Sequence, residues 1–383
     1  MKYFPWLLIP LLLFVGCGKS DSDNVPEHLT EIQNLTIYDS EEKAKYEIEL
    51  RQIQVFEEPN DLMFGQIFDF AVDESHRVYI SEFAQNHAAI HAFESDGSYI
   101  TSIGGYGDGP GEFRSIISPQ AYSNYLYTFD GSQQKINVYS LNNFSVERSI
   151  QPDRQSWSHI EELNGASLYD FTVLDSDKLL VTFLKSEERK DILFRYLMNQ
   201  SGEIISDTVV QQVYAEHFVH PDTGSITYSP FSSNGLLAIS NDGYLYTVWT
   251  EEIFFKKHTM DGQYISSFYH PFSNEELSRD EVLDYNDSEI FEASVRNTGF
   301  PEYLPAIHSL VVDDLNNFWI STVIEDENMY EWWILSSDGE VLSKFEWPKR
   351  SDIRIVKNGT LYALETAPVT GIRKVVKYEF NYE

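Results

Sequence analysis

Residues 104–113 read GGYGDGPGEF, a glycine-dense loop that lies between two segments with the composition of β-strands. Strand-like segments of the same kind recur along the rest of the chain. A glycine loop that joins strands, within a chain whose strand pattern repeats, is typical of a β-propeller.

The repeat becomes measurable when the strongest strands are aligned on the large apolar residue at their centre. These anchors are Tyr79, Tyr127, Leu180, Tyr246, Trp319 and Tyr362, at intervals of 48, 53, 66, 73 and 43 residues. One four-stranded blade needs roughly 40 to 50 residues. The spacing therefore predicts an all-β, six-bladed propeller in which the two longest intervals contain inserted loops.

Glycine turns mark the outer half of most blades. After four of the anchors, two further strands are joined by Asp96-Gly97, Ser201-Gly202, Asp261-Gly262 or Asp338-Gly339. Such residues tolerate the positive φ that a tight hairpin demands. The second blade ends in residues 136–150, INVYSLNNFSVERSI, without a glycine at this turn.

The last blade is incomplete in sequence, because only one long strand, residues 372–382, follows Tyr362. The run YEIELRQIQV, residues 46–55, alternates polar and apolar residues and precedes the first full blade. We expect this N-terminal strand to pair with the last blade, so that the ring has no open edge.

The N-terminus has the features of an export signal. Lys2 precedes an apolar run over residues 4–15, too short for the roughly 20 residues that cross a bilayer. Gly16-Cys17 follows at once and resembles the lipobox of bacterial lipoproteins, although Phe14 stands where that family usually has leucine. The resemblance implies that residues 1–16 are removed and that Cys17, the only cysteine of the chain, is lipidated. An ordinary signal peptide with an incidental cysteine is the alternative.

The segment after the cysteine is polar and acidic. Residues 17–45 therefore form the lipidated cysteine and a flexible tether, and residues 46–383 form the propeller. Gly18 is not the aspartate that some envelope sorting systems read as a retention signal. By resemblance to those systems, we expect a lipid-anchored protein of the cell envelope, at the outer membrane, on its periplasmic or surface face.

The net charge of the chain limits the classes of partner that it can bind. The chain has 61 acidic and 27 basic residues, a formal charge of −34. This charge opposes binding to nucleic acid or anionic lipid, so contact with the membrane is expected through the N-terminal lipid only.

Two segments carry a family resemblance. Residues 67–113 contain FAVDESHRVYISE, IHAFESDGSYITSIG and GYGDGPGEF, and residues 301–321 read PEYLPAIHSLVVDDLNNFWIS. They resemble the six-bladed β-propeller lipoproteins of Bacteroidota and related phyla, which are similar to NHL-repeat propellers. The resemblance implies the fold and leaves the activity open, because known members are largely of undefined function.

Two motifs invite a chemical interpretation. The glycine loop lacks the Lys-Ser/Thr ending of a phosphate-binding loop, so its glycines are expected to form a compact turn and Phe113 to fill a core. His217-x-x-His220, with Glu216 and Asp222, is the only dense group of possible metal ligands, and zinc or copper would suit it. A pair of solvated loop histidines is the favoured interpretation, so we predict no metal and no cofactor.

The remaining insertion, near residues 273–297, has the pattern of a helical excursion capped by Ser273 or Asn274. Together with residues 154–159 and 216–228, this excursion, to Tyr303, is expected to shape a rim surface. The predicted contact residues each combine a polar group with a large area: Arg154, Trp157, His159, His217, His220 and Tyr228.

We therefore expect a non-enzymatic binding module whose partner is an envelope protein or an extracellular oligomer. The alternative is a metal-dependent hydrolase or lyase with its site at the mouth of the central channel.

Overall fold

The computed structural model describes residues 26–383 except for 41, 60–63, 85–86 and 116–117. The chain divides into two compact units, Met1–Gln33 and Asn34–Glu383. The described part of the first unit contains a turn of 3-10 helix, Glu27–Leu29. The predicted signal peptide, Cys17 and the first part of the predicted tether lie outside the described residues. Among the residues that are described, no helix is long and apolar enough to cross a membrane.

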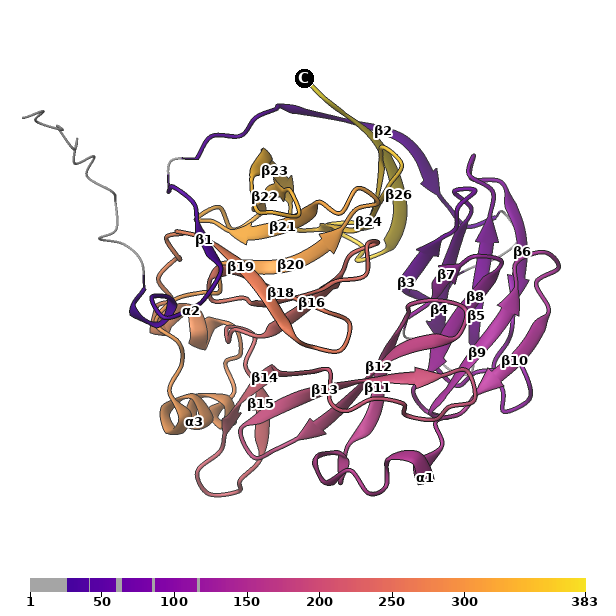
Figure 1. The fold of residues 1–383 in the computed structure, drawn as a ribbon, viewed down its shortest axis with the longest axis horizontal. Coiled ribbons are helices and arrows are strands. Elements are labelled where there is room, and N and C mark those ends of the chain that lie inside the picture. The colour runs from indigo at the N-terminus through magenta and orange to yellow at the C-terminus, as the bar shows by residue number, and fades with distance from the viewer. Residues whose placement is uncertain (1–25, 41, 60–63, 85–86, 116–117) are drawn as a thin grey trace, which may run out of the picture. The chain divides into compact units, whose positions relative to one another are not determined.

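The second unit consists of six sheets that follow one another along the chain, each a propeller blade (Figure 1). Blade one contains β3 (Gln66–Val72), β4 (Val78–Ala84), β5 (His87–Phe93) and β6 (Tyr99–Ile103). Blade two contains β7 (Gln120–Tyr122), β8 (Tyr125–Asp130), β9 (Lys135–Ser140) and β10 (Val146–Ile150). Blade three contains β11 (Ser167–Val173), β12 (Lys178–Ser186), β13 (Lys190–Asn199), β14 (Val210–Val219) and β15 (Ile226–Tyr228).

The other three blades complete the ring. Blade four contains β16 (Gly235–Ile239), β17 (Leu245–Trp249), β18 (Ile253–His258), β19 (Tyr264–His270) and β1 (Leu35–Ile37), the last of which is parallel to β19. Blade five contains β20 (Ile307–Val312), β21 (Phe318–Val323), β22 (Met329–Leu335) and β23 (Val341–Pro348). Blade six contains β24 (Ser351–Lys357), β25 (Thr360–Thr366), β26 (Arg373–Tyr382) and β2 (Ile48–Phe56). The prediction of an all-β, six-bladed propeller is confirmed.

The six predicted anchors occupy one equivalent place, the second strand of each blade. They lie in β4, β8, β12, β17, β21 and β25, and each is at most 1% exposed. A strand that is covered on both faces has to be apolar throughout, which is why these strands stood out in the sequence.

Apolar clusters join each blade to the next around the whole ring. Separate buried clusters link blades one and two, two and three, three and four, four and five, and five and six. A sixth links blade six to blade one and includes Phe56, Val72, Tyr362 and Val375. Every blade is thereby covered on both faces by its neighbours.

The N-terminal strand forms the outer edge of the last blade. Strand β2 pairs antiparallel with β26 from Ile48, opposite Tyr382, to Phe56, opposite Val375. Two of its residues, Ile48 and Leu50, also pack against the cluster between blades five and six.

The turns between the third and fourth strands follow the predicted chemistry. Gly97, Gly202, Gly262 and Gly339 all have φ between 85° and 101°. In blade two, which lacks a glycine there, Phe144 adopts φ 59° instead.

Two predictions about the insertions are wrong in detail. The helical excursion contains α2 (Arg279–Asp284) and α3 (Glu289–Thr298), which are capped by Ser278 and Ser288 and not by Ser273 or Asn274. The Asn274 side chain instead donates to the carbonyls of Glu251 and Leu304, 2.9 Å away in each case, and so joins two loops.

The second correction concerns residues 216–228, which form a β-hairpin and not a solvated loop. Strands β14 and β15 extend blade three, with His217 opposite Tyr228 and Val219 opposite Ile226. The polar turn between them, residues 220–225, hid the strand pattern in the sequence.

The glycine loop has the predicted structural role. Phe113 is fully buried in the cluster between blades one and two, and its backbone N–H donates to the Gly105 carbonyl at 2.9 Å. Gly104 has φ +69°, and a Cβ placed on it would lie 2.4 Å from Phe113 Cζ. A side chain at position 104 would therefore push Phe113 out of its place.

Substitution Gly104→Ala is expected to lower the free energy of unfolding by about 2–4 kcal/mol, because it adds positive-φ strain to a steric conflict with a buried ring. The matched control is Gly105→Ala, where a Cβ would meet nothing within 4 Å. Urea unfolding should show a change of less than about 0.5 kcal/mol for the control. Equal effects of the two substitutions would contradict this account.

Deletion of residues 46–55 is expected to lower the melting temperature sharply, because it leaves the edge of β26 unpaired and removes Ile48 and Leu50 from their cluster. Replacing Leu35–Ile37 by Gly-Ser-Gly, which removes only the short outer strand β1, should cost less stability. An unchanged melting temperature in the deletion variant would show that the ring does not need this strand.

Candidate functional site

The structure separates the predicted contact residues into two groups. Arg154 and Trp157 begin and end α1 (Arg154–Trp157), in the connection from blade two to blade three, and His159 follows it. Arg154 and His159 are exposed, but Trp157 is half-buried and packs on Phe183 with ring centroids 4.7 Å apart. Trp157 therefore belongs mainly to the core between these blades.

The two histidines of the predicted metal motif have unrelated surroundings. His217, on β14, is 7% exposed, and its Nε2 lies 3.2 Å from Asp191 Oδ1. His220 lies in the hairpin turn, where its Nδ1 accepts from the backbone N–H groups of Asp222 and Thr223 at 3.3 Å. Within the described residues, no group of three or more His, Cys, Asp or Glu side chains could hold a metal ion.

The hairpin of blade three and the helical excursion pack together. Phe218 and Phe291 meet edge to face at 5.5 Å, within a cluster that also holds Val282 and Val295. Polar contacts reinforce this packing, because the Asn297 side chain donates to the Val219 carbonyl at 2.9 Å. Two of the three predicted rim segments thus form one structure.

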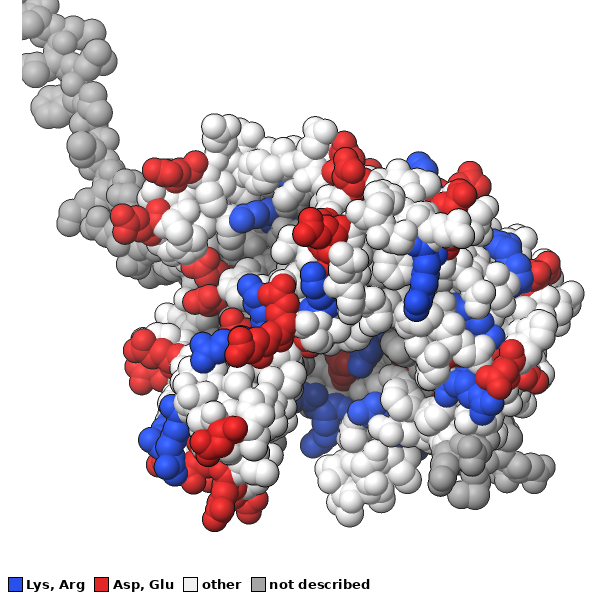
Figure 2. Space-filling view, turned by 90° about the horizontal axis from the view of Figure 1, so that it is seen from below, with Lys and Arg blue, Asp and Glu red and all other residues white. Residues whose placement is uncertain are grey.

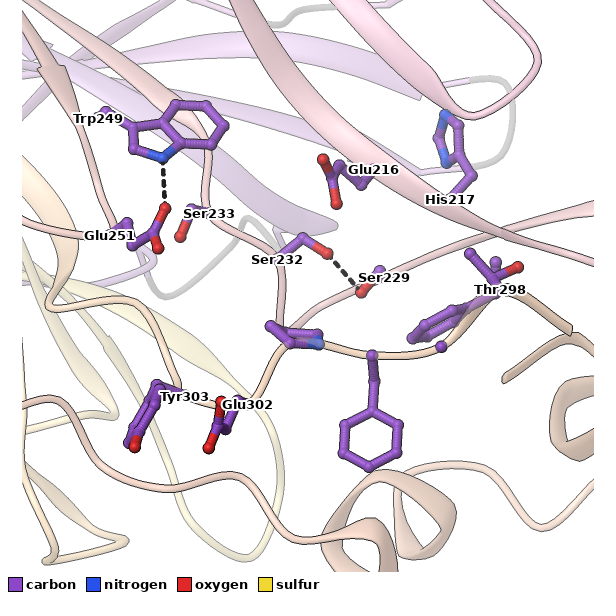
Figure 3. A pocket seen from close by; sticks show the side chains of 14 residues that line it. Glu216, His217, Ser229, Ser232, Ser233, Trp249, Glu251, Thr298, Glu302 and Tyr303 are labelled. Carbon is purple, nitrogen blue, oxygen red and sulfur yellow. Dashed lines mark hydrogen bonds between the residues drawn. The ribbon is translucent and has the colours of Figure 1, made fainter. Parts of the chain in front are cut away.

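A cleft of about 650 Å³ opens where these segments meet the end of β17 (Figure 3). Trp249 and Glu251 lie opposite Glu302 and Tyr303 in this view. The residues that line the cleft are Glu216, His217, Phe218, Ser229, Ser232, Ser233, Trp249, Glu251, Thr298, Gly299, Phe300, Pro301, Glu302 and Tyr303. We call this the acidic cleft. His217 lines it, whereas its strand partner Tyr228, which is 50% exposed, does not.

The backbone on both sides of the acidic cleft is held in place. On one side, the Trp249 indole N–H donates to the Glu251 carboxylate at 2.9 Å. On the other, the Glu302 carbonyl accepts from the Leu277 N–H at 2.9 Å, and Tyr303 pairs with Glu276 in an isolated β-bridge. The aromatic and acidic side chains of the cleft are therefore presented from fixed positions.

The charge of the acidic cleft is uncompensated. Three glutamates line it, Glu216, Glu251 and Glu302, and no lysine or arginine does. None of the three is within 4 Å of a basic nitrogen in the described ion pairs, which involve other carboxylates. The cleft thus has three carboxylates and several aromatic rings along its walls, a combination that suits a cationic group.

A second group of ionisable residues lies where the first strands of the blades converge. Strands β3, β11, β20 and β24 each have a β-bulge, at Phe68, Tyr169, His308 and Arg354. A bulge leaves one residue unpaired and redirects its side chain. These registers cannot be read from the sequence, which is why the sequence analysis missed this group.

Acidic and basic side chains lie next to one another around these bulges. Arg354 Nη1 lies 3.4 Å from Asp69 Oδ1, and its Nε donates to Asp352 at 2.5 Å. Burial raises the pKa of Asp69 to about 6, and the neighbouring Asp170 and Asp352 add to this rise, whereas Arg354 opposes it. Burial likewise lowers the pKa of Arg195 to about 10, against the attraction of Asp170. Figure 2 shows that acidic and basic side chains both reach into the hollowed middle of one face.

Comparison with known proteins identifies the fold and not the ligand. Residues 56–284, more than half of the chain, match the model of a family described as 6-bladed beta-propeller, DUF5128. No curated protein matches the chain.

Two solved structures from Bacteroides are similar over nearly their whole length. One is an exported protein from Bacteroides fragilis, with TM-score 0.51 and 11% identity, over 91% of this chain and 99% of that one. The other is a member of the DUF4221 family from Bacteroides vulgatus, with TM-score 0.53 and 12% identity, over 88% and 99% of the two chains. At this identity the likeness shows the fold alone.

The raised pKa of Asp69 predicts a pH dependence of stability. An unfolded Asp has a pKa of about 3.9, so between about pH 4 and pH 6 the native state binds more protons at this site than the unfolded state. Stability contributed by this site is therefore lost as the pH rises through that window, by about 1 kcal/mol between pH 5 and pH 7.5.

Urea unfolding of the wild type and of Asp69→Asn at these two pH values checks this expectation: the wild type should lose stability relative to the variant as the pH rises. Asp96→Asn is the control, because hydrogen bonds from Ser98 lower the pKa of that exposed carboxylate, so it is ionised in the native and unfolded states at both pH values and this variant should run parallel to the wild type. Parallel pH profiles for the wild type and Asp69→Asn would contradict the assignment.

Proposed function

Because the chain belongs to this family of 6-bladed β-propellers, we propose that it is a binding module of the cell envelope that holds a basic segment of a protein partner in the acidic cleft. The blades supply a rigid frame, and the insertions between them supply the binding surface.

The observation that carries the proposal is that Glu216, Glu251 and Glu302 line one cleft and that no lysine or arginine lines it. Convergent carboxylates attract Lys or Arg, and a ring such as Trp249 or Tyr303 can cover the apolar part of such a side chain. The formal charge of −34 favours the same partners at long range, because it steers cationic groups towards the molecule.

An exported, lipid-anchored location is part of the proposal. It is supported by the apolar run before Gly16-Cys17, which resembles a lipobox, and by the exported protein of the same fold from Bacteroides fragilis. Attachment to the outer membrane through Cys17 would hold the propeller where it can meet an envelope partner. The tether in this proposal is shorter than the predicted one, because Leu35–Ile37 form β1 of blade four.

The other ligand class that the sequence suggested, an extracellular oligomer such as a glycan, would use the same aromatic rings and the hydroxyls of Ser232 and Ser233. Three uncompensated carboxylates favour a basic peptide over a neutral sugar. No observation favours the alternative of a metal-dependent hydrolase or lyase, since the described residues contain no group of metal ligands.

The test is calorimetric titration of the purified protein with short amidated peptides that contain paired Lys or Arg residues. Binding should be saturable and should weaken as sodium chloride is raised from about 0.05 M to 0.3 M, because added salt screens the ionic contacts. The double variant Glu251→Gln/Glu302→Gln should bind at least about tenfold more weakly, equivalent to ~1.4 kcal/mol.

The matched control is Glu94→Gln/Glu147→Gln, which makes the same change in net charge at exposed positions of blades one and two. It should leave the affinity within about twofold of the wild type. If the two double variants weaken peptide binding equally, the effect comes from the overall charge of the protein. That result would contradict specific binding in the acidic cleft. Saturable binding of neutral oligosaccharides in place of basic peptides would assign the cleft to the other ligand class.

A further inference from the structure

A second cavity, of about 200 Å³, lies between blades five and six and has the opposite charge to the rest of the molecule. Four basic side chains line it, Lys349, Arg350, Arg354 and Arg373, and one acidic side chain, Asp352. The whole chain has more than twice as many acidic as basic residues, 61 against 27. We call this cavity the basic pocket.

The fold fixes the positions of the four cations. Lys349 and Arg350 are the two residues that connect β23 to β24, so they lie where the chain passes from one blade to the next. Their backbones are held by hydrogen bonds of 2.8 Å, one from the Lys349 N–H to the Asn328 carbonyl and one from the Thr366 N–H to the Arg350 carbonyl. The backbone conformation of this connection therefore fixes where the Lys349 and Arg350 side chains begin.

The other two arginines reach the pocket from different strands of blade six. Arg354 is the residue left unpaired by the bulge in β24, and Arg373 is the first residue of β26. The Arg373 guanidinium donates to the Ile67 carbonyl of blade one at 3.1 Å, which holds its head group in place.

Most of this positive charge has no carboxylate partner. Arg354 is paired with Asp352 and Asp69. In the described ion pairs, no carboxylate oxygen lies within 4 Å of Lys349, Arg350 or Arg373. The Lys349 ammonium lies 4.9 Å from the centre of the Tyr330 ring. A chain rich in surplus carboxylates therefore leaves three cations around one small cavity without a carboxylate partner in the described ion pairs.

We propose that the basic pocket binds a small oxyanionic group, a phosphate, sulfate or carboxylate. Guanidinium groups present paired N–H donors that match the oxygens of such groups, and Lys349 adds a further donor. The cavity volume suits one such group with its immediate substituent, not a bulky ligand. This inference stands on different residues from those of the acidic cleft and does not depend on the proposed function.

His308 gives a local probe of an anion in the pocket. It lines the cavity and stacks on Tyr330 with ring centroids 4.7 Å apart. Burial lowers the pKa of His308, Lys349 and Arg354 lower it further, and Asp352 opposes them. A bound anion would raise this pKa, because it stabilises the charged imidazolium.

The experiment is titration of the purified protein with sodium phosphate, sodium sulfate and sodium acetate at constant ionic strength, followed by calorimetry and by the NMR signals of His308. Saturable binding of at least one of these anions is expected, together with an upward shift of the His308 pKa. The relative affinities of the three salts show which oxyanion the pocket prefers. Absence of saturable binding of all three would overturn the proposal.

The variant Lys349→Gln/Arg350→Gln should weaken anion binding at least tenfold and abolish the shift of the His308 signal. The control Lys178→Gln/Arg189→Gln removes one lysine and one arginine at exposed positions away from the pocket and should leave both readouts unchanged. Arg373→Gln is a second pocket variant, for use if the first lowers the melting temperature. Equal losses in pocket and control variants would also overturn the proposal.

Discussion

The contact between the last blade and the first is the interaction on which the ring depends. Each sheet of the propeller has two apolar faces, and each face is covered mainly by the neighbouring blade. If blades six and one were apart, Phe56, Val72, Tyr362 and Val375 would face water. The free energy of that exposure, about 1.5–3 kcal/mol for each large side chain, makes the closed ring strongly favoured. Strand β2 also belongs to this region, since it lies in one sheet with the last strand, β26.

A closed ring determines where ligands can bind. The blades contribute packed, rigid strands, so variation is confined to the connections between them. Here the longest connection carries α2 and α3, and its packing against β14 forms one wall of the acidic cleft. The shortest connection, Lys349 and Arg350, forms part of the basic pocket. Long and short connections thus produce two sites of opposite charge.

The two sites are close neighbours. Tyr303 lines the acidic cleft and His308 lines the basic pocket, only five residues further along the chain. A fully extended chain spans at most about 3.5 Å per residue, so their Cα atoms are within about 18 Å of each other.

The number of blades, their order and most of the turns within them can be predicted from the amino-acid sequence alone. Large apolar residues such as Tyr79 and Trp319 recur because every blade must bury the same strand, and glycines such as Gly97 recur because the turn needs positive φ. These are local or periodic requirements, and a linear pattern records them. The polar hairpin turn after His217 and the two caps of the excursion were misread, because side chains such as that of Asn274 bond to residues far away in the chain.

The positions of the acidic cleft and the basic pocket, in contrast, follow from the tertiary structure. The acidic cleft takes its walls from four separate segments between Glu216 and Tyr303, and the basic pocket takes cations from a turn and two strands. The bulges at His308 and Arg354 depend on strand register, which is set by pairing with a neighbouring strand. The order of residues does not show which charged side chains lie together in the folded protein, because ring closure brings them together from separate blades.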